Sequence, residues 1–482
     1  MKIYAKTFGE DARVDSKWMA AIKRIIRASH FPSTMSDGEF GLKKIKDLCI
    51  RYLLEKAEQT TVDNGAYSSV RVDAARVAQL KSRLKFSLTA CQEKGVVEIS
   101  NGLQAEKRML RLVNGDVGTG KTETYLLPCV AAAMGGASLG IMVPNDILAR
   151  GIVERIRGIE PHAKVKLVTG SGDDGLYHGY ILVGTSALVH RSKKYSLNFD
   201  ILVIDEEQKF SVEQKSVLVQ DKTNVIYSTA TCIPRTGALL QYGNVEVTIL
   251  KTCPVEKKIH SRIIGQLDYF KMINYLKRFT NEGKQVGVVF VKLAKEAKPK
   301  KGEEASNEPK KQRGKRGKSL EEHVGAFQNE FGGDVTVLHG KLKDTEKDYV
   351  IQSMIQGKYK VLICSNIIET GITLPDLFSL TIFDADYLGI SQLHQLRGRL
   401  ARLGGVGEFN MVPSENCSEL GLAKLQVIKD NLDGFVVAEK DLEIRGFGDL
   451  SYDSQSQTGE SNGLFFCLPI MPNNVAEYMA SR

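Results

Sequence analysis

The chain has 482 residues, of which 42% are hydrophobic and 26% charged, so it is long enough for two or three domains that each bury a core. Its net charge of +9 is concentrated between Lys292 and Lys318, where eleven Lys and Arg stand against four Glu, and the remainder is close to neutral. This distribution excludes a protein that binds polyanions through a uniformly basic surface, and the one long uncharged run, Leu126 to Val143, is interrupted by Pro128 and two adjacent glycines, which argues against a membrane span.

The first 83 residues are predicted to form a small, mainly helical accessory domain. Met1 to Lys6 lacks the apolar run of a secretory signal, so we expect a cytoplasmic protein, in a bacterial cell or an infected host. A strand is predicted at Lys2 to Phe8, and helices at Trp18 to Ala28, Leu42 to Glu58 and Ala74 to Leu84. Lys and Arg side chains on these helices form either a solvated polar face or a surface that contacts the substrate.

Residues 84 to 255 alternate short apolar runs with helical patterns. This alternation predicts a parallel sheet that is covered by helices on both faces. In such a sheet, ligands bind at the carboxyl ends of the strands. The predicted strands are Arg111 to Val113, Leu139 to Val143, Val165 to Thr169, Tyr180 to Gly184, Ile201 to Asp205 and Val225 to Ser228.

The octet that begins at Gly115 has the G-x-x-x-x-G-K-[ST] spacing of a phosphate-binding loop. Glycines let the backbone N–H groups point inward at phosphate oxygens, and the following helix presents its positive end to the same anion. We expect Lys121 to reach the β- and γ-phosphates of ATP and the Thr122 hydroxyl to ligate Mg²⁺. The expected loop consists of Gly115, Asp116, Val117, Gly118, Thr119, Gly120, Lys121 and Thr122.

Two further segments follow predicted strands of the same sheet. The apolar run Ile201 to Ile204 ends in Asp205 and Glu206. We expect Asp205 to hold Mg²⁺ through its water shell and Glu206 to orient and deprotonate the attacking water. The segment Ser228 to Thr236 carries small hydroxyl residues that either link hydrolysis to movement or cap a turn, and the spacing does not decide between these two roles.

A second α/β unit is predicted over residues 256 to 415. Between its first strand and a helix near Glu321 lies Lys295 to Lys318, which is too poor in large apolar residues to fold alone. We interpret it as a flexible basic insertion that either contacts nucleic-acid phosphate or is simply solvated. A helical pattern is predicted in the tail from about Gly404, and residues 416 to 482 form a C-terminal segment. The predicted strands are Gln285 to Val291, Val335 to Leu338, Val361 to Cys364 and Leu380 to Phe383.

The segment Gln392 to Arg402 is predicted to be an arginine-rich helix with Arg399 and Arg402 on one side. Across a cleft, these two groups could neutralise charge on the γ-phosphate, as an arginine finger does. The alternative is a basic helix that faces solvent or a phosphate backbone. A phosphate loop in one unit and this helix in the other indicate a composite ATP site that opens and closes with each turnover, which is typical of a motor.

Together these segments resemble superfamily 2 helicases and, within them, the double-stranded DNA translocases RecG and Mfd. The resemblance covers about residues 84 to 460 and implies two tandem RecA-like α/β domains. It rests on Phe86 to Gln92, Gly115 to Thr122, Pro144 to Ala149, Val183 to Leu188, Asp205 to Phe210, Thr229 to Thr236, Leu338 to Gly340, Ile367 to Ile372, the arginine-rich helix, and Asp433 to Gly446 with Gln455 and Gly459. The last of these looks like the translocation motif that RecG and Mfd share.

The resemblance also implies roles for single residues. Gln92 would read the adenine edge with Phe86 nearby, Gln395 would contribute to the ATP site, and Arg445 would couple closure of the cleft to DNA movement. Contacts to the phosphate backbone position a motor without reading sequence, which fits the near-neutral body of the chain. The residues implied to contact nucleic acid are Pro144, Arg150, Gly184, Thr185, His339, Gly340, Thr370, Gly371 and Arg445.

What the resemblance implies is a monomeric ATP- and Mg²⁺-dependent enzyme that translocates on double-stranded and branched DNA in recombination, repair or replication. Lys209, Ser211, Thr373 and Phe447 depart from the family's usual residues. The region before the motor is too short for the wedge domain of RecG, and the compact size suits a phage or mobile-element branch-migration helicase. Two alternatives stay open: a helicase that tracks along RNA or a single strand, and a DNA-binding clamp that uses ATP only as a switch.

Overall fold

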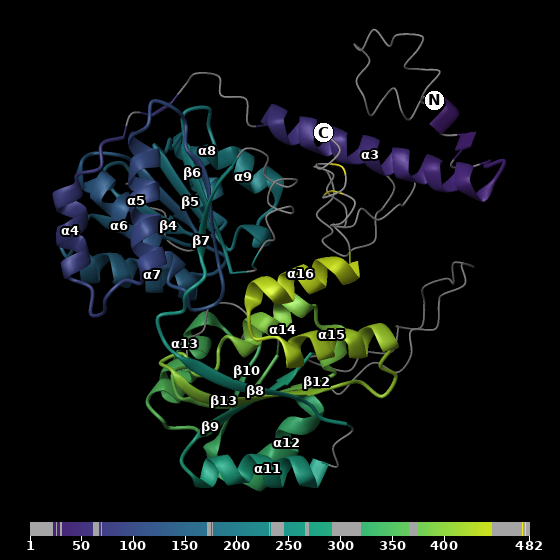
Figure 1. Cartoon of the computed structure of the whole chain (residues 1–482). Helices are drawn as coiled ribbons and strands as arrows, with labels where there is room; N and C mark the ends of the chain where they lie inside the picture. The colour runs from purple at the N-terminus through teal and green to yellow at the C-terminus, as the bar shows by residue number, and fades with distance from the viewer. Residues whose placement is uncertain are drawn as a thin grey trace, which may run out of the picture. The chain divides into compact units, whose positions relative to one another are not determined.

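The computed structural model (Figure 1) divides by its internal contacts into two parts. One comprises Met1–Val62, Arg235–Asn244 and Leu442–Arg482, and the other comprises Asp63–Pro234 and Val245–Asp441. No helix in the described part of the chain combines the length and the hydropathy that crossing a membrane requires. The structure describes residues 23–25, 27–28, 31–60, 67–68, 70–170, 175, 177–230, 232, 245–265, 269–291, 320–365, 374–445, 475 and 478.

The first sheet has seven strands in the order β3-β4-β2-β5-β6-β1-β7, and all of its pairings are parallel. Its central strands are buried along their whole length, as expected when helices cover both faces. The strands are β1 (Leu110–Gly115), β2 (Leu139–Met142), β3 (Val165–Val168), β4 (Ile181–Gly184), β5 (Ile201–Asp205), β6 (Asn224–Thr229) and β7 (Glu246–Leu250).

Local capping signals define the starts of the helices around this sheet. The Thr89 hydroxyl accepts from the Gln92 N–H and the Gln92 side chain accepts from the Thr89 N–H, which is a complete capping box. Asn145 caps the next long helix after β2 in a similar way. The helices are α4 (Ala74–Ser82), α5 (Ala90–Gln104), α6 (Lys121–Met134), α7 (Asp146–Ile159), α8 (Ala187–Tyr195) and α9 (Val212–Leu218), with a 3-10 turn η1 (Glu207–Lys209).

The second sheet has six parallel strands in the order β10-β11-β9-β12-β13-β8. Its strands are β8 (Lys257–Ile263), β9 (Gln285–Phe290), β10 (Val335–Leu338), β11 (Val361–Cys364), β12 (Leu377–Phe383) and β13 (Gly405–Val412). Its helices are α11 (Tyr269–Asn281), α12 (Leu320–Phe331), α13 (Asp344–Ile355), α14 (Ile390–Arg397), α15 (Glu419–Asp430) and α16 (Gly434–Arg445), with 3-10 turns η2 (Gly332–Asp334) and η4 (Ala385–Tyr387).

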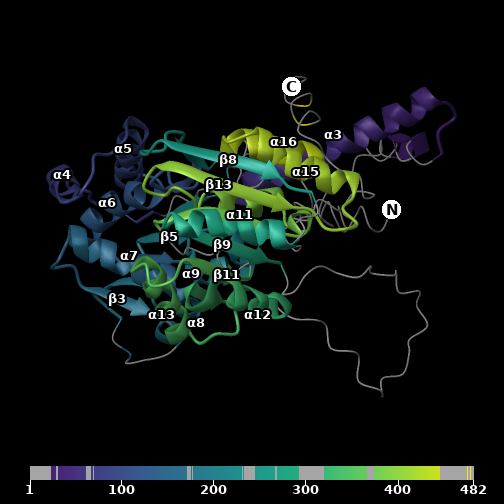
Figure 2. The same cartoon turned by 90° about the horizontal axis from the view of Figure 1, so that it is seen from below.

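The structure confirms two parallel sheets with helices and every strand that the sequence predicted in them. Among the described residues, three strands were missed. β7 and β8 lie at sheet edges and carry polar as well as apolar residues, and β13, which lies beside β8 (Figure 2), begins with a glycine and contains another. The helical pattern predicted in the tail from about Gly404 is confirmed by α15 and α16, but β13 precedes these helices, since Gly405–Val412 pairs with β12 and β8.

The apolar core of the first sheet includes residues that precede the predicted domain boundary. Val70, Val72 and Leu80 are buried in the same cluster as α5, α6 and β2. A boundary near residue 62 fits this packing better than one at residue 83. The helix α3 (Met35–Thr60), which belongs to the part that contains Met1–Val62, is longer than the helix predicted at Leu42 to Glu58. The predicted strand Lys2 to Phe8, the insertion Lys295 to Lys318 and most of the C-terminal segment lie outside the described residues.

Leu127 provides a test of this core. It is fully buried on α6, and Leu127→Ala leaves a cavity without lowering helix propensity, so we expect a loss of about 2–5 kcal/mol in the free energy of unfolding. The matched control is Leu420→Ala on α15, where the side chain is 54% exposed and the change should stay within about 0.5 kcal/mol. Equal thermal midpoints for the two variants would contradict this packing.

Candidate active site and nucleic-acid surface

The phosphate loop joins β1 to α6, so the predicted order of strand, loop and helix is confirmed. Gly118 and Gly120 have φ values of 87° and 76°, in the left-handed region that favours glycine. A Cβ at Gly120 would lie 2.0 Å from the Gln92 side-chain nitrogen, so no other residue fits there without rearrangement. The Lys121 ammonium donates to the carbonyls of Gly115 and Asp116 at 2.7 and 2.9 Å.

Gln92 supports this loop from α5. Its side chain is 1% exposed, and its amide nitrogen donates to the Thr119 carbonyl at 2.8 Å. Its oxygen accepts the Thr89 N–H at 2.7 Å, so both ends of the amide are engaged with the backbone. Phe86, which precedes α5, is 52% exposed. The expected contact of Gln92 with adenine stays a prediction.

The carboxyl ends of β5 and β1 flank that of β6, which brings Asp205 to the side of the loop. The buried Tyr125 hydroxyl donates to Asp205 Oδ2 at 3.1 Å and is also hydrogen-bonded to the Thr122 side chain. Burial and the neighbouring Asp205 charge raise the pKa of Tyr125 well above its ordinary value, so it stays a neutral donor. A hydroxyl and a carboxylate that share one partner form a hard oxygen pair of the kind that suits Mg²⁺.

Glu206 follows Asp205 in a left-handed backbone conformation, with φ of 54°. Such a conformation is sparsely populated outside glycine and recurs at functional sites. Burial and the charge of Asp205 raise the pKa of Glu206, while Lys121 and Arg399 act in the opposite direction. The Gln208 amide donates to Glu206 Oε2 at 2.5 Å. Glu206 is therefore close to the loop lysine and to an arginine of the second α/β unit.

For the segment Ser228 to Thr236, the sequence left open a link to hydrolysis and a turn cap, and one contact of Thr229 bears on the first of these. The Thr229 hydroxyl, at the end of β6, donates to Gln208 Oε1 at 3.2 Å, and Gln208 in turn donates to Glu206. Thr229 is thus connected to the candidate base through one side chain. Of the remaining residues to Thr236, only Ala230 and Cys232 lie among those described.

Arg399 and Arg402 do not lie on a helix, so that part of the prediction was wrong. The helix α14 ends at Arg397, and the chain then turns through Gly398 and a left-handed Ala401 with φ of 48°. A Cβ at Gly398 would lie 2.7 Å from the Val117 Cβ, so this turn packs directly on the phosphate loop. The backbone that leads into Arg399 and Arg402 therefore lies against the phosphate loop.

These two arginines carry their charges in a largely buried environment. Arg399 is 8% exposed. Burial lowers the pKa of Arg402 to about 9, and the charges of Arg399 and Arg155 act in the same direction. Both guanidinium groups remain protonated at neutral pH and repel each other. A triphosphate chain would offset this repulsion, so the cluster suits a polyanion.

Two residues near the loop were missed by the sequence analysis. The Lys257 ammonium on β8 lies 3.1 Å from where a Cβ of Gly118 would be, and burial together with the charges of Arg402 and Arg399 lowers its pKa. His394 on α14 contacts Asp116 through its Nε2. Neither residue is part of a recognisable sequence motif. Both reach the loop only because the second α/β unit packs against the first. Gln395, the neighbour of His394, is buried on the same helix.

The residues expected to contact nucleic acid lie at other strand ends. Pro144 follows β2, and Gly184 and Thr185 end and follow the adjacent β4, where the Val143 N–H donates to the Gly184 carbonyl at 2.9 Å. His339 and Gly340 follow β10 in the second sheet. The carboxyl ends of the strands in the first sheet thus carry the phosphate loop at β1 and the candidate nucleic-acid residues at β2 and β4.

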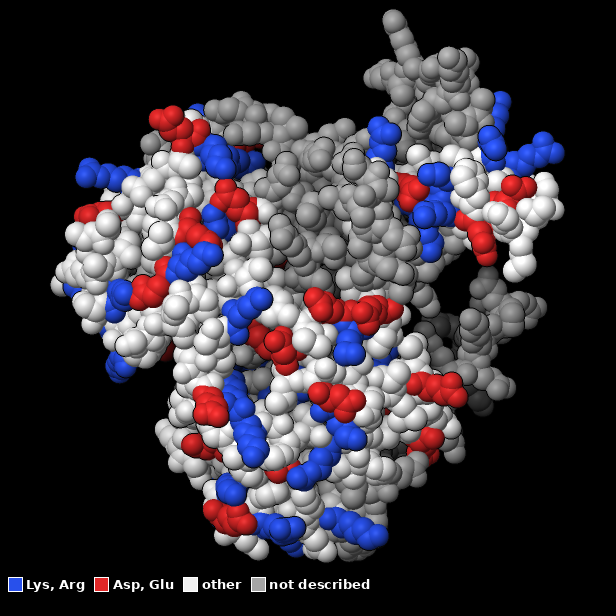
Figure 3. All heavy atoms as spheres, viewed as in Figure 1, with Lys and Arg blue, Asp and Glu red and all other residues white. Residues whose placement is uncertain are grey.

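Arg150 on α7 already has a protein partner. It forms an ion pair with Asp348 of α13 at 2.9 Å, and both side chains are substantially exposed. Thr370 and Gly371 lie outside the described residues, and for Arg445 the structure describes only its backbone, at the end of α16. On the face drawn in Figure 3, Lys and Arg alternate with Asp and Glu over the described residues instead of forming one basic patch.

Comparison with known proteins identifies both halves of this site. A family model described as DEAD/DEAH box helicase matches residues 89–237, and one described as helicase conserved C-terminal domain matches residues 271–404. The first range contains the loop, Asp205 and Glu206, and the second contains Arg399 and Arg402.

Individual relatives are consistent with these domains. The chain is 31% identical over 450 residues to the ATP-dependent DNA helicase RecG of Streptococcus pneumoniae serotype 4, covering 89% of this chain and 64% of that protein. It is 30% identical over 418 residues to RecG of Staphylococcus epidermidis, covering 84% and 58%. The chain therefore spans about three fifths of the length of these curated relatives.

Among solved structures, one described as RecG bound to a three-way DNA junction shares the fold. Its TM-score is 0.69 at 22% identity, and the match covers 95% of this chain and 59% of that one. These matches confirm the predicted resemblance and the two tandem RecA-like domains. The chain belongs to the superfamily 2 helicases of the RecG type.

Proposed function

We propose that this chain hydrolyses ATP with Mg²⁺ to translocate on duplex DNA and to remodel branched DNA, such as forks and Holliday junctions. The observation that carries the proposal is the packing of the turn at Gly398 on Val117 of the phosphate loop, which brings Lys121, Glu206 and Arg399 within range of one another's charge. The first two follow strands of one sheet and the third follows a helix of the other. A nucleotide held by all three would join the two sheets, and its hydrolysis would release them.

The residues divide the chemistry among them. Loop N–H groups and Lys121 bind the phosphates, and Glu206, held by Gln208, orients a water and accepts its proton. Arg399 and Arg402 neutralise charge that develops on the transferred phosphoryl group. Mg²⁺, held by Thr122 and Asp205, would supply further charge neutralisation. Hydrolysis therefore depends on positioning and electrostatics and needs no covalent intermediate.

The DNA part of the proposal has family-level support. The curated relatives are named ATP-dependent DNA helicases, and one similar structure is described as bound to a three-way junction. The strand-end positions of Pro144, Gly184, Thr185, His339 and Gly340 suit backbone contacts through amides and hydroxyls. We further propose that the protein acts as a monomer in the cytoplasm, and that the accessory domain predicted for residues 1–83 is limited to the part before residue 63.

An RNA or single-strand helicase is the second candidate, because a structure of Dbp5 from S. cerevisiae, described as bound to RNA, has a TM-score of 0.53 over 73% of this chain. That similarity, at 19% identity, concerns the fold alone. The identity of about 30% to proteins named ATP-dependent DNA helicases favours DNA over RNA.

Replacing Glu206 by Gln tests the base assignment. The amide keeps the shape but cannot accept a proton, so we expect ATP binding to persist while the turnover rate falls by about 10²–10⁴-fold. Binding is measured with a fluorescent ATP analogue and turnover by phosphate release. Lys121→Ala is the comparison, since it should lose binding or turnover altogether. A full hydrolysis rate in the Glu206 variant would exclude this residue as the base.

Arg402→Ala tests the contribution of the second α/β unit. We expect ATP to bind but to be hydrolysed on the order of 10²-fold more slowly, because a transition-state charge contact is lost. The control is Arg278→Ala, since this arginine is exposed on α11. Similar rates for both variants would contradict a composite site.

The substrate is tested by measuring ATPase and unwinding side by side on Holliday junctions, forks, linear duplex, single-stranded DNA and RNA. The proposal predicts the strongest stimulation by junctions and duplex, together with ATP-driven displacement of a triplex strand. Stimulation by single strands or RNA alone would favour the second candidate. Binding to DNA without displacement would instead indicate an ATP-switched clamp.

A further inference from the structure

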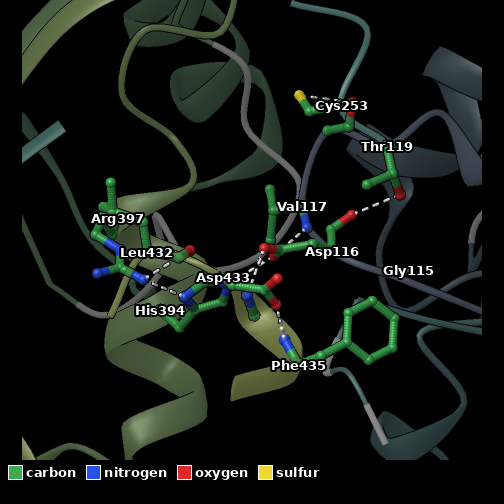
Figure 4. Close-up of polar contacts among 12 residues, drawn as sticks. Gly115, Asp116, Val117, Thr119, Cys253, His394, Arg397, Leu432, Asp433 and Phe435 are labelled. Carbon is green, nitrogen blue, oxygen red and sulfur yellow. Dashed lines mark hydrogen bonds and ion pairs between the residues drawn. The ribbon is translucent and has the colours of Figure 1, made fainter. Parts of the chain in front are cut away.

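The side chain of Asp116 points out of the phosphate loop toward the second α/β unit (Figure 4). Its Oδ1 lies 2.6 Å from His394 Nε2 and its Oδ2 accepts the Gly434 N–H at 3.0 Å. Oδ1 also accepts the Val117 N–H of its own loop at 2.5 Å. One carboxylate thus contacts the loop, α14 and the first residue of α16.

The neighbours of His394 determine its tautomer. An Arg397 nitrogen lies 2.7 Å from His394 Nδ1. Because a guanidinium can only donate, Nδ1 must accept, and the proton of a neutral imidazole is then on Nε2. His394 therefore donates to Asp116, and its orientation is defined on both sides. Both His394 and Arg397 are buried.

Arg397, which contacts His394, also contacts the segment before α16. It donates to the carbonyls of Ile428, Asn431 and Leu432 at 2.5, 2.7 and 3.3 Å, at the end of α15 and just beyond it. A cation at a helix carboxyl end also interacts favourably with the helix dipole. The next residue, Asp433, caps α16 by accepting the Phe435 N–H at 2.7 Å.

The contact between the loop and α16 leaves no room for a side chain at position 434. A Cβ there would lie 2.6 Å from Asp116 Cγ and 2.8 Å from His394 Nε2. Burial would raise the pKa of Asp116, but the hydrogen bonds from His394 and Val117 and the charge of Lys121 more than offset it, so the pKa is lowered. The carboxylate stays ionised and keeps its three donors.

We propose that Asp116, His394 and Gly434 form a joint that transmits movement of the phosphate loop to α16. This inference rests on the proposed function and deepens it. Asp116 is then a positioning residue in addition to a member of the loop. A nucleotide that reshapes the loop must move its side chain, and the carboxylate moves the first turn of α16, whose last residue is Arg445.

Gly434→Ala is the direct test, because the atoms nearest to the added methyl group belong to the Asp116 carboxylate and the His394 ring, and none of them belongs to Lys121, Glu206 or the two arginines. We expect the ATPase rate without DNA to stay within about twofold, and the number of base pairs translocated per ATP to fall by at least about fivefold. The control is Gly325→Ala on α12, where an added Cβ meets nothing within 4 Å. An unchanged number of base pairs per ATP in the Gly434 variant would overturn the joint.

A second pair of variants covers the case that Gly434→Ala fails to fold. His394→Gln keeps an N–H that can reach Asp116, whereas His394→Leu does not. Coupling should be retained better by Gln than by Leu. In an Asp116→Ala background, Gly434→Ala should cause a much smaller further loss of coupling, since the carboxylate it displaces is gone and only the contact with His394 remains. Additive losses would indicate that the two positions act independently and would overturn the proposal.

Amide hydrogen exchange separates failure of the joint from failure of the proposed function. In the wild type, a non-hydrolysable ATP analogue with Mg²⁺ should change protection at residues 435–437, and in the Gly434 variant it should not. This readout needs no DNA. An active translocase with no change at these amides would overturn the joint alone. A change at these amides in a protein without DNA-stimulated ATPase would support the joint and contradict the proposed function.

Discussion

The site depends on one backbone constraint, the left-handed conformation of Gly120 beside the buried Gln92 amide. Only a residue without Cβ fits there, since Gln92 would lie 2.0 Å away from one. Gln92 is in turn fixed by its capping box with Thr89 and by the Thr119 carbonyl. The start of α5 therefore holds the loop that begins α6. This support comes from local sequence signals, which explains why the loop is recognisable from its residue spacing alone.

Because the strands of the first sheet are parallel, their carboxyl ends all lie on one side of the sheet, and the candidate functional residues lie there too. The strands β5, β6 and β1 are neighbours, and their carboxyl ends deliver Asp205, Thr229 and the loop to one place. The strands β2 and β4 are neighbours on the other side of β5 and deliver the candidate nucleic-acid residues. The strand β5 stands where the two groups meet. A shift at the nucleotide therefore has a short path to the nucleic-acid side through a rigid sheet.

Sequence patterns predicted what depends on continuous burial and failed where a residue's role depends on the other sheet. Strands such as β5 are buried throughout and were found, whereas the edge strands β7 and β8 are only partly buried and were missed. The arginine-rich segment has helical spacing, but its contact with Val117 requires Gly398 and a turn, so the helix ends early. No sequence motif identifies Lys257 and His394, because the loop residues that they contact, Gly118 and Asp116, lie more than a hundred residues away in the chain.

The loop uses two chemically separate parts of its structure for two purposes. In the proposed function its N–H groups and Lys121 bind the phosphates, and this does not depend on most of the other side chains in the loop. Asp116 is the exception, because its carboxylate accepts donors from α14 and α16 and is held in place by both. Arg397 binds the segment before α16 from the opposite side, so that segment cannot move independently of the arginine turn. Under the proposed joint, a change in the loop would reach Arg399, Arg402 and α16 together, as is required if hydrolysis and movement are to be coupled.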